Sequence, residues 1–317
     1  MTGADPLMND EARRRSLPPT ERRNPLSQNL DELDSLQVLR LLNAEDRVAV
    51  DAVAALLPDL ARVVDIAADR LRRGGTVHYF GAGTSGRLGV LDASELMPTF
   101  NLEPGRVVGH IAGGEQALVN AVENAEDSEE DGRRAAAGLG ADDVAIGLAA
   151  SGSTPYVGGA LEAAGAAGAH TVLVSSNPEA PLARYADSNL VLDTGAEVVT
   201  GSTRLKAGTA QKLVLNGFST ALMIATGHTW QNLMVSVVAT NSKLRDRTVR
   251  ILCEAADLQE STARELLQRT GGDLKVAIVA SLSEVSPQRA RNLLEENGGS
   301  VRDTLAGALD VRDGARL

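Results

Sequence analysis

The sequence predicts an α/β protein in which helices cover both faces of a parallel sheet of about five strands. Short runs rich in β-branched residues alternate with helical stretches between residues 76 and 193, a pattern typical of right-handed βαβ units. Apolar residues make up 43% of the chain but aromatic residues only 2%, so the core must be built from Ala, Val, Leu and Ile. Such small side chains suit helices that pack closely on a parallel sheet.

The expected elements of this α/β/α arrangement follow in order along the chain. Apolar positions recur at helical spacing in two N-terminal stretches, 30–43 and 45–73. Strands are expected at 76–80, 106–112, 143–150, 170–175 and 189–193. Between the strands, helices are expected near 86–97, 115–126 and 155–167.

The C-terminal part of the chain has a different pattern. Long helices are predicted from Ala207 to about Leu252, and glycines and a proline then separate shorter helical segments. These short helices are expected near 257–269, 273–281 and 286–296. We therefore expect an N-terminal arm and helix over 1–50, an α/β domain over 51–252 and a small all-helical module over 253–317.

Composition excludes several classes of protein. The formal net charge of −11 argues against nucleic-acid binding, which needs a basic surface. Cys253 is the only cysteine, so no disulfide can form within the chain, and the four histidines lack the spacing of a zinc site. No apolar run reaches the roughly 18 residues of a membrane span, and the N-terminus lacks the apolar core of a signal peptide. We expect a soluble, cytoplasmic protein.

The most specific signal is a strand-like run that ends in a glycine loop before a helix. This arrangement presents backbone N–H groups and a helix N-terminus to an anion. The spacing Gly81-x-Gly83-x-x-Gly86 also fits a dinucleotide fingerprint, but alone this signal is weak. The acidic residue expected about 20 positions further on is poorly placed. Because the hydroxyls of Thr84 and Ser85 suit a small phosphate monoester, we favour a phosphate-binding loop.

Two further polar loops are candidates for the same site. One follows the predicted strand 143–150, and the other, 201–209, adds hydroxyls and two cations. Loops at the carboxyl ends of parallel strands share one edge of the sheet, so the loops can face one another across a crevice. Each loop alone is more simply explained by helix capping. Together they indicate a phosphorylated, hydroxyl-rich ligand such as a sugar phosphate. The candidate binding residues are Gly83, Thr84, Ser85, Ser151, Gly152, Ser153, Thr154, Ser202, Arg204 and Lys206.

Two glutamates occupy positions at which a helix is expected to be apolar. Glu95 follows two leucines, and Glu126 two valines, at the spacing of a single helix face. We expect both to lie on core-facing stripes, where desolvation raises the pKa of a carboxyl group. Such a group suits general acid or base catalysis. Spacing alone leaves open that each glutamate caps a helix or pairs with an arginine.

Several motifs carry a specific resemblance. The segment Gly81-Ala-Gly-Thr-Ser-Gly-Arg-Leu-Gly-Val-Leu-Asp-Ala-Ser-Glu95 resembles the signature of the N-acetylmuramic acid 6-phosphate etherase family. The other motifs that share the resemblance are Thr20-Glu-Arg-Arg-Asn-Pro25, Ala125-Glu-Asp127, 201–212, and Asn232-Leu-Met-Val235 with Ala239-Thr-Asn241. The resemblance spans about residues 20–250. It implies a sugar isomerase (SIS) domain, whose glycine- and Ser/Thr-rich loops hold sugar phosphates.

The resemblance implies a lyase that uses no metal or organic cofactor. Family members remove the D-lactyl ether from N-acetylmuramic acid 6-phosphate, giving N-acetylglucosamine 6-phosphate and D-lactate in amino-sugar and peptidoglycan recycling. Glu95 matches the family's acid/base glutamate and Glu126 its second active-site glutamate. Arg204 and Lys206 can bind the lactyl carboxylate or the phosphate, and this choice stays open. We expect the helices at 207–252, which carry Ala, Val and Met, to bury their faces in a homodimer, because SIS-domain proteins generally dimerise. The C-terminal module is expected to resemble ubiquitin-associated bundles.

The chain departs from the family pattern in places. Ser153 stands where the family usually has arginine, which removes a bidentate anion donor, and Asn124 stands where glycine is usual. Two alternative functions therefore stay open. Glucokinase regulatory proteins share these loops and bind sugar phosphates without catalysis, although they usually contain two such domains. Aldose–ketose isomerases of the SIS class also use a carboxylate at C2.

Overall fold

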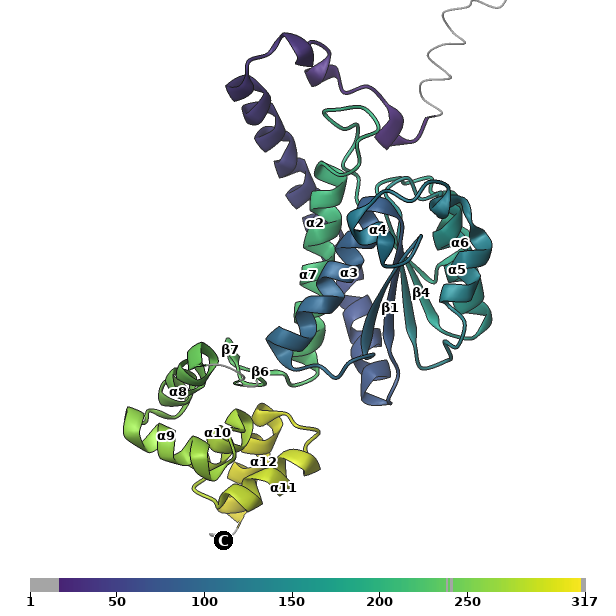
Figure 1. Ribbon diagram of the computed structural model, residues 1–317. Helices are drawn as coiled ribbons and strands as arrows, with labels where there is room; N and C mark the ends of the chain where they lie inside the picture. Colours follow the sequence, from purple (N-terminus) through teal and green to yellow (C-terminus); the bar gives the residue numbers. More distant parts are fainter. Residues whose placement is uncertain (1–16, 238, 240–241, 315–317) are drawn as a thin grey trace, which may run out of the picture. The chain divides into compact units, whose positions relative to one another are not determined.

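The computed structural model describes residues 17–237, 239 and 242–314 (Figure 1). Within it the chain forms two compact units. One contains Gly105–Ser219 and the described residues up to Ala93, and the other contains Ser94–Pro104 and the described residues from Thr220 onward. Two helices, α3 (Gly83–Phe100) and α7 (Lys206–Ala225), contribute residues to both units.

A five-stranded parallel sheet forms the centre of the first unit (Figure 1). Its strands are β1 (Val77–Gly81), β2 (Val107–Ile111), β3 (Val144–Leu148), β4 (His170–Ser175) and β5 (Ser188–Val191). They lie in the order β2-β1-β3-β4-β5, and every neighbouring pair is parallel. The α/β class and all five predicted strands are confirmed. Because the order reverses between β1 and β3, the loops after these two strands flank the switch point at which such sheets bind ligands.

Helices α5 (Glu129–Ala135) and α6 (Pro155–Ala166) cover one face of this sheet. Alanines of α6 and Phe80 of β1 share one core there, as the aromatic-poor composition predicts. The two helices approach closely because glycines face the contact. A Cβ atom at Gly159 would lie 2.0 Å from the carbonyl oxygen of Glu129, and one at Gly132 would lie 1.9 Å from that of Tyr156.

The opposite face of β1 packs against α3 and α7, so the unit has three layers. The Tyr79 ring meets Phe218 of α7 edge to face. The Tyr79 hydroxyl donates a 3.0 Å hydrogen bond to buried Asp92 of α3, which also accepts 3.0 Å hydrogen bonds from Asn216 and Ser219 of α7. Burial raises the pKa of Asp92, and these three donors oppose that rise. Asp92 therefore joins a strand and two helices.

The N-terminal segment forms an arm followed by one long helix, where two helices were predicted. The arm contains the 3-10 turns η1 (Pro19–Glu21), η2 (Pro25–Ser27) and η3 (Leu30–Glu32). Helix α2 (Ser35–Arg72) then runs for 38 residues. Asp34 begins it with a capping box to Gln37. Since neither glycine nor proline stands near residue 44, nothing in the sequence forces the predicted break.

The predicted helix over 115–126 is wrong. The structure has only the short helix α4 (Gln116–Val119) and the 3-10 turn η4 (Ala125–Asp127) in this region. Asn124 has a φ of 58°, in the left-handed region, so a continuous helix cannot pass through it. The same conformation explains why an asparagine can replace the usual glycine here, because asparagine tolerates it better than other side chains.

The second unit contains a β-hairpin and a helical cluster. Helix α7 ends near Gly227, whose φ is 78°, and β6 (Thr229–Trp230) pairs antiparallel with β7 (Leu233–Met234). The helices that follow are α8 (Ser242–Ala256), α9 (Glu260–Arg269), α10 (Leu274–Leu282), α11 (Pro287–Glu296) and α12 (Val301–Gly314). The three predicted short helices are confirmed, whereas the hairpin interrupts the helical region predicted up to Leu252.

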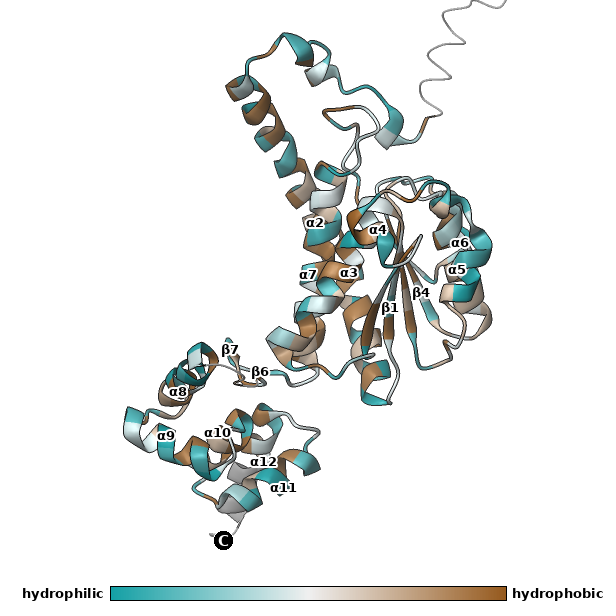
Figure 2. Cartoon of the chain, viewed as in Figure 1, coloured by the Kyte–Doolittle hydropathy of each residue, from teal (hydrophilic) through white to brown (hydrophobic). Residues whose placement is uncertain are grey.

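Apolar residues of α8, α9, α10 and α11 form a common core with Val235 after the hairpin, and Figure 2 shows apolar residues along these helices. Residues 220–237 thus share their contacts with the C-terminal helices, and the domain boundaries predicted at residues 50 and 252 stay predictions. Across the described part of the chain, no helix is long and apolar enough to cross a membrane.

Candidate active site

The two predicted phosphate loops start side by side at the edge of the sheet. Gly81, the last residue of β1, pairs in register with Leu148, the last residue of β3. The glycine loop follows Gly81, and the Ser151–Thr154 loop follows β3 and leads into α6. Adjacent loops at the switch point are the arrangement that the sequence predicted, and their binding of a phosphorylated ligand stays a prediction.

Glycine is required where the glycine loop turns into α3. A Cβ atom at Gly86 would lie 2.6 Å from the carbonyl oxygen of Gly81 and 2.7 Å from a side-chain carbon of Ile111. The amide of Gly86 donates to the carbonyl of Ala82 at 3.1 Å. The first turn of α3 therefore begins immediately at the strand end, so its backbone N–H groups lie at the switch point.

The hydroxyls of these loops are not used for ordinary helix capping. Thr154 holds the N-cap position of α6 but makes no side-chain capping bond. Ser153 instead donates from its hydroxyl to the Ser151 hydroxyl at 2.9 Å. Ser85 donates to the side-chain oxygen of Gln211 at 2.8 Å. Gln211 is 1% exposed, and its amide nitrogen has no partner among the described residues. Polar groups with spare hydrogen-bonding capacity thus gather beside the glycine loop.

The third predicted loop, 201–209, leads into helix α7, whose N-terminus is capped by a glutamate from before the loop. Glu197 is fully buried and accepts hydrogen bonds from the backbone amides of Lys206 at 3.2 Å and Ala207 at 2.9 Å, which caps α7. Burial raises the pKa of Glu197, opposed by these two amides. The Lys206 ammonium lies 2.5 Å from the Glu45 carboxylate and is buried with it, whereas Arg204 is exposed. The structure therefore separates the two cations that the sequence grouped together.

Glu126 lies next to the glycine loop. It lines a cavity of about 240 Å³ together with Ala82 and Gly83. Arg87 of α3 holds the segment before Glu126 by donating to the carbonyls of Leu118 at 3.1 Å and Asn120 at 3.3 Å. A carboxylate and the first residues of the glycine loop thus line one small cavity.

The predicted burial of the two glutamates is wrong. Glu95 and Glu126 are both exposed, as are the stripe residues Leu91, at 53%, and Val119, at 85%. The buried positions of α3 include Gly89, Asp92 and Leu96, so the core-facing stripe lies one residue from the predicted one. Near Glu126 the continuous helix that defined the stripe is absent. The desolvation argument loses its basis for both residues, and their joint catalytic role stays a prediction.

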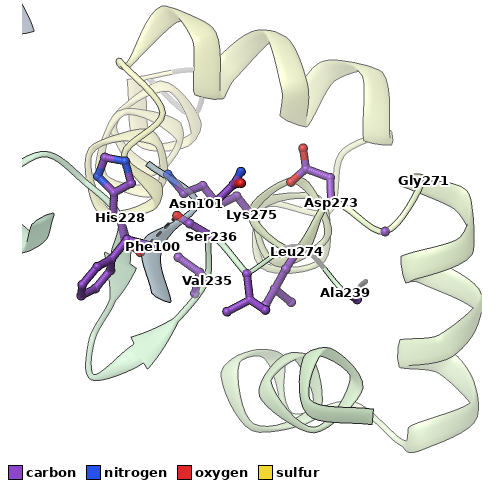
Figure 3. A pocket seen from close by; sticks show the side chains of 12 residues that line it. Phe100, Asn101, His228, Val235, Ser236, Ala239, Gly271, Asp273, Leu274 and Lys275 are labelled. Atoms are coloured by element: carbon purple, nitrogen blue, oxygen red, sulfur yellow. Dashed lines mark hydrogen bonds between the residues drawn. The ribbon is translucent and has the colours of Figure 1, made fainter. Parts of the chain in front are cut away.

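Polar residues also line other cavities. One, of about 420 Å³, brings Arg22 of the arm to Ser151 and Ser153. Another, of about 470 Å³, lies in the second unit and is lined by His228, Ser236, Asp273 and Lys275 among others (Figure 3). There the Lys275 ammonium donates to the carbonyls of Gly227 and Gly299, both at 2.8 Å, so it ties the end of α7 to the turn after α11.

Comparison with known proteins places the chain in a family. A model of the glucokinase regulatory protein N-terminal SIS domain matches residues 59–165, and a model of the SIS domain matches residues 117–221. An N-acetylmuramic acid 6-phosphate etherase of Thermobifida fusca (strain YX) is 54% identical over 83% of this chain and 87% of the relative. The etherase of Edwardsiella ictaluri (strain 93-146) is 51% identical over 83% and 88%. The chain belongs to the N-acetylmuramic acid 6-phosphate etherase family.

Among solved structures, a phosphoheptose isomerase from Francisella tularensis matches with a TM-score of 0.50 at 18% identity. The match covers 61% of this chain and 100% of that one. This likeness bears on the fold alone. It agrees with the SIS architecture predicted from the etherase motifs. Two residues of those motifs, Thr240 and Asn241, lie outside the described residues.

Several polar residues around the etherase loops were not anticipated from the sequence. Asn24 and Gln211 stand within etherase motifs, so their positions could have been noted, although not their contacts. Glu197 lies just before the 201–209 loop. Glu45 sits in the middle of a long helix and gave no signal, because only the fold shows that its carboxylate meets Lys206.

Proposed function

We propose that the chain cleaves the D-lactyl ether of N-acetylmuramic acid 6-phosphate, giving N-acetylglucosamine 6-phosphate and D-lactate. It is then a carbon–oxygen lyase of amino-sugar and peptidoglycan recycling. Family membership supports the activity. The geometric observation that supports it best is the shared cavity of Glu126 and the glycine loop, since this places a carboxylate beside a phosphate-binding element.

The sugar phosphate binds at the switch point. The backbone of Gly83 and the hydroxyls of Thr84 and Ser85 come from the loop after β1. The loop after β3 supplies Ser151, Gly152, Ser153 and Thr154, and the loop before α7 supplies Ser202 and Arg204. Because neighbouring hydroxyls and N–H groups suit phosphate oxygens, the first two loops hold the phosphate. Exposed Arg204 is left for the carboxylate of the lactyl group.

The reaction proceeds by elimination and then hydration. Opening of the sugar ring frees the C1 aldehyde, which acidifies the proton on C2. A carboxylate removes that proton, the C3–oxygen bond breaks, and the lactyl oxygen leaves with a proton from a carboxylic acid. Water then adds across the C2–C3 double bond of the unsaturated aldehyde: its oxygen bonds to C3 as a hydroxyl group, and C2 regains a proton from solvent. The elimination needs one base at C2 and one acid at the departing lactyl oxygen, so two carboxyl groups are sufficient for its proton transfers.

We assign these two roles to the family glutamates. Glu126 acts as the base at C2, and Glu95 is the acid that protonates the departing lactyl oxygen. The proximity of Glu126 to the glycine loop supports a position near the sugar. Glu95 stands in the longest etherase motif. An acid and a base in different surroundings suit a reaction that needs both protonation states.

We further propose that the enzyme is a cytoplasmic homodimer. Large apolar side chains that are more than half exposed lie along α2, namely Leu36, Leu39, Val50 and Leu57. Such a row is unfavourable in water and suits a second copy of the chain. Sedimentation over a range of concentrations tests this, and a monomer mass at every concentration would refute it.

A lactate assay tests the proposed activity against its two alternatives. Purified protein is incubated with N-acetylmuramic acid 6-phosphate, and D-lactate and N-acetylglucosamine 6-phosphate are measured. We expect equal amounts of both products. Tight sugar-phosphate binding without lactate release would favour a regulatory protein. Interconversion of an aldose and a ketose phosphate would favour an isomerase.

A further inference from the structure

A buried polar network joins three segments that lie far apart in the sequence. Glu45 of α2 is 8% exposed, and one of its carboxylate oxygens accepts two hydrogen bonds. Lys206, which is 4% exposed, donates at 2.5 Å, and Asn24 of the arm donates at 2.7 Å. A buried carboxylate and ammonium are costly unless paired, so each of these charges requires the other.

Both amide protons and the side-chain oxygen of Asn24 are hydrogen-bonded. Its second amide proton goes to the carbonyl of Ala196 at 3.1 Å, and its side-chain oxygen accepts from the amide of Leu26 at 2.9 Å. Close by, the carbonyl of Thr20 accepts from the amide of Gly201 at 3.1 Å. The arm is thereby hydrogen-bonded to the 196–206 loop at two separate points.

The same loop is fixed at its other end. Glu197 binds the backbone amides of Lys206 and Ala207, so residues 198–205 form a closed span between two anchored ends. That span contains Ser202 and Arg204, which the proposed function places on the substrate. Its conformation depends on polar contacts at both ends rather than on a helix or strand.

We propose that Glu45 and Asn24 are positioning residues: they fix the loop that presents Ser202 and Arg204, and Lys206 serves as the buried counterion of Glu45 rather than as a substrate ligand. This inference rests on the proposed function for the identity of the substrate. It assigns a role to the N-terminal arm, which orders a substrate loop through Asn24. It also leaves Arg204 as the exposed cation of that loop.

Paired substitutions in the full-length protein separate the two roles of Lys206. Lys206→Met leaves the Glu45 carboxylate buried without its partner. Glu45→Gln likewise leaves the Lys206 ammonium buried without a carboxylate. Each single variant should lose roughly tenfold or more in kcat/KM. In Glu45→Gln/Lys206→Met both charges are gone and Gln can still accept from Asn24, so kcat/KM should return to within ~3-fold of wild type. A double variant as impaired as Lys206→Met would show that Lys206 binds substrate and would overturn the proposal.

Asn24→Ala tests the positioning role without leaving a buried charge. We expect a higher KM with kcat near wild type, and faster amide hydrogen exchange at residues 200–205. Asn29→Ala on the same arm is the control, because Asn29 makes no side-chain capping bond, and neither quantity should change. A purely structural role would lower the melting temperature but leave the KM of the folded enzyme unchanged, which would overturn the proposal.

Hydrogen exchange also separates this proposal from the proposed function. If wild type releases no lactate, the activity is refuted, and the exchange rates of residues 200–205 still test the positioning of the loop. A further double variant, Glu45→Gln/Asn24→Ala, removes both proposed positioning residues. If hydrogen exchange at residues 200–205 is unchanged in Asn24→Ala and in this folded double variant, the positioning role is refuted whatever the activity of the enzyme.

Discussion

The Nδ1 atom of His78 and the Nε2 atom of His110 lie 2.8 Å apart on one face of the sheet. The Nε2 atom of His78 lies 2.8 Å from the Thr76 hydroxyl, which donates to the Asp143 carboxylate at 2.6 Å. Since the hydroxyl proton is used by Asp143, the Nε2 atom of His78 must donate to Thr76. Burial lowers the pKa of both rings, which favours their neutral forms. In a neutral His78 the Nδ1 atom accepts from His110, and the remaining nitrogen of His110 is the one that can accept a proton.

This pair predicts a loss of stability in mild acid. Burial lowers the pKa of His78 and lowers that of His110 to about 4, and unfolding restores both toward about 6.5. Because the unfolded chain then binds more protons, the free energy of unfolding should fall as the pH drops from about 6.5 toward 4. Urea denaturation of His110→Phe, which keeps a ring stacked on Phe80, should show a smaller drop than wild type. An equal drop would contradict this account.

The contact between α5 and α6 predicts a steric effect at one glycine. In Gly159→Ala the new Cβ would collide with the Glu129 carbonyl, so the helices must separate and the free energy of unfolding should fall by about 1–3 kcal/mol. Gly165→Ala in the same helix is the matched control. Its nearest neighbour, a methyl group of Thr171, would lie 3.6 Å away, so it should gain up to about 1 kcal/mol. Equal effects in the two variants would exclude close packing as the cause.

The left-handed conformation of Asn124 links backbone geometry to activity. Asn124→Ala should strain the turn by about 1–2 kcal/mol and displace Glu126, two residues further on, so kcat should fall. Asn124→Gly relieves that constraint and should keep the turnover of wild type. Lactate release by both variants at saturating substrate measures this. A Gly variant as slow as the Ala variant would point to a role for the asparagine side chain itself.

Much of the fold could be predicted because it depends on local patterns. Short runs that contain β-branched, aromatic or other apolar residues mark all five strands, and a glycine loop after the first strand marks the switch point. The predictions failed where tertiary contacts decide the outcome. The apolar spacing near Glu95 and Glu126 indicated burial, but the exposed Leu91 and Val119 show that apolar residues need not face the core of one chain.

The site itself was only partly predictable for the same reason. Motifs located the three loops, since each loop is continuous in the sequence. The partner of Lys206 lies 161 residues away, so no spacing could reveal that its charge is neutralised. Likewise, the capping of α7 by Glu197 crosses a loop rather than a helical turn, and helix-capping rules do not anticipate it.

Because the two glutamates are assigned different roles, replacing each by glutamine should block a different step of the reaction. Glu126→Gln should lose both lactate release and exchange of the C2 proton with solvent deuterium. Glu95→Gln should still exchange that proton while releasing little lactate. Each should lower turnover at least ~100-fold. Glutamine nearly preserves shape, so both variants should fold. Exchange lost in Glu95→Gln and kept in Glu126→Gln would mean that the roles are reversed.

Isotopic labelling tests elimination and hydration most directly. The reaction is run in water enriched in both deuterium and oxygen-18, and both products are analysed by mass spectrometry. We expect deuterium at C2 and oxygen-18 at C3 of N-acetylglucosamine 6-phosphate, with no solvent oxygen in the lactate hydroxyl, because the sugar C3–oxygen bond breaks. Fragmentation locates the label, since the C1 aldehyde oxygen exchanges with water unaided. Oxygen-18 in the lactate hydroxyl, or lactate release without deuterium at C2, would contradict the mechanism.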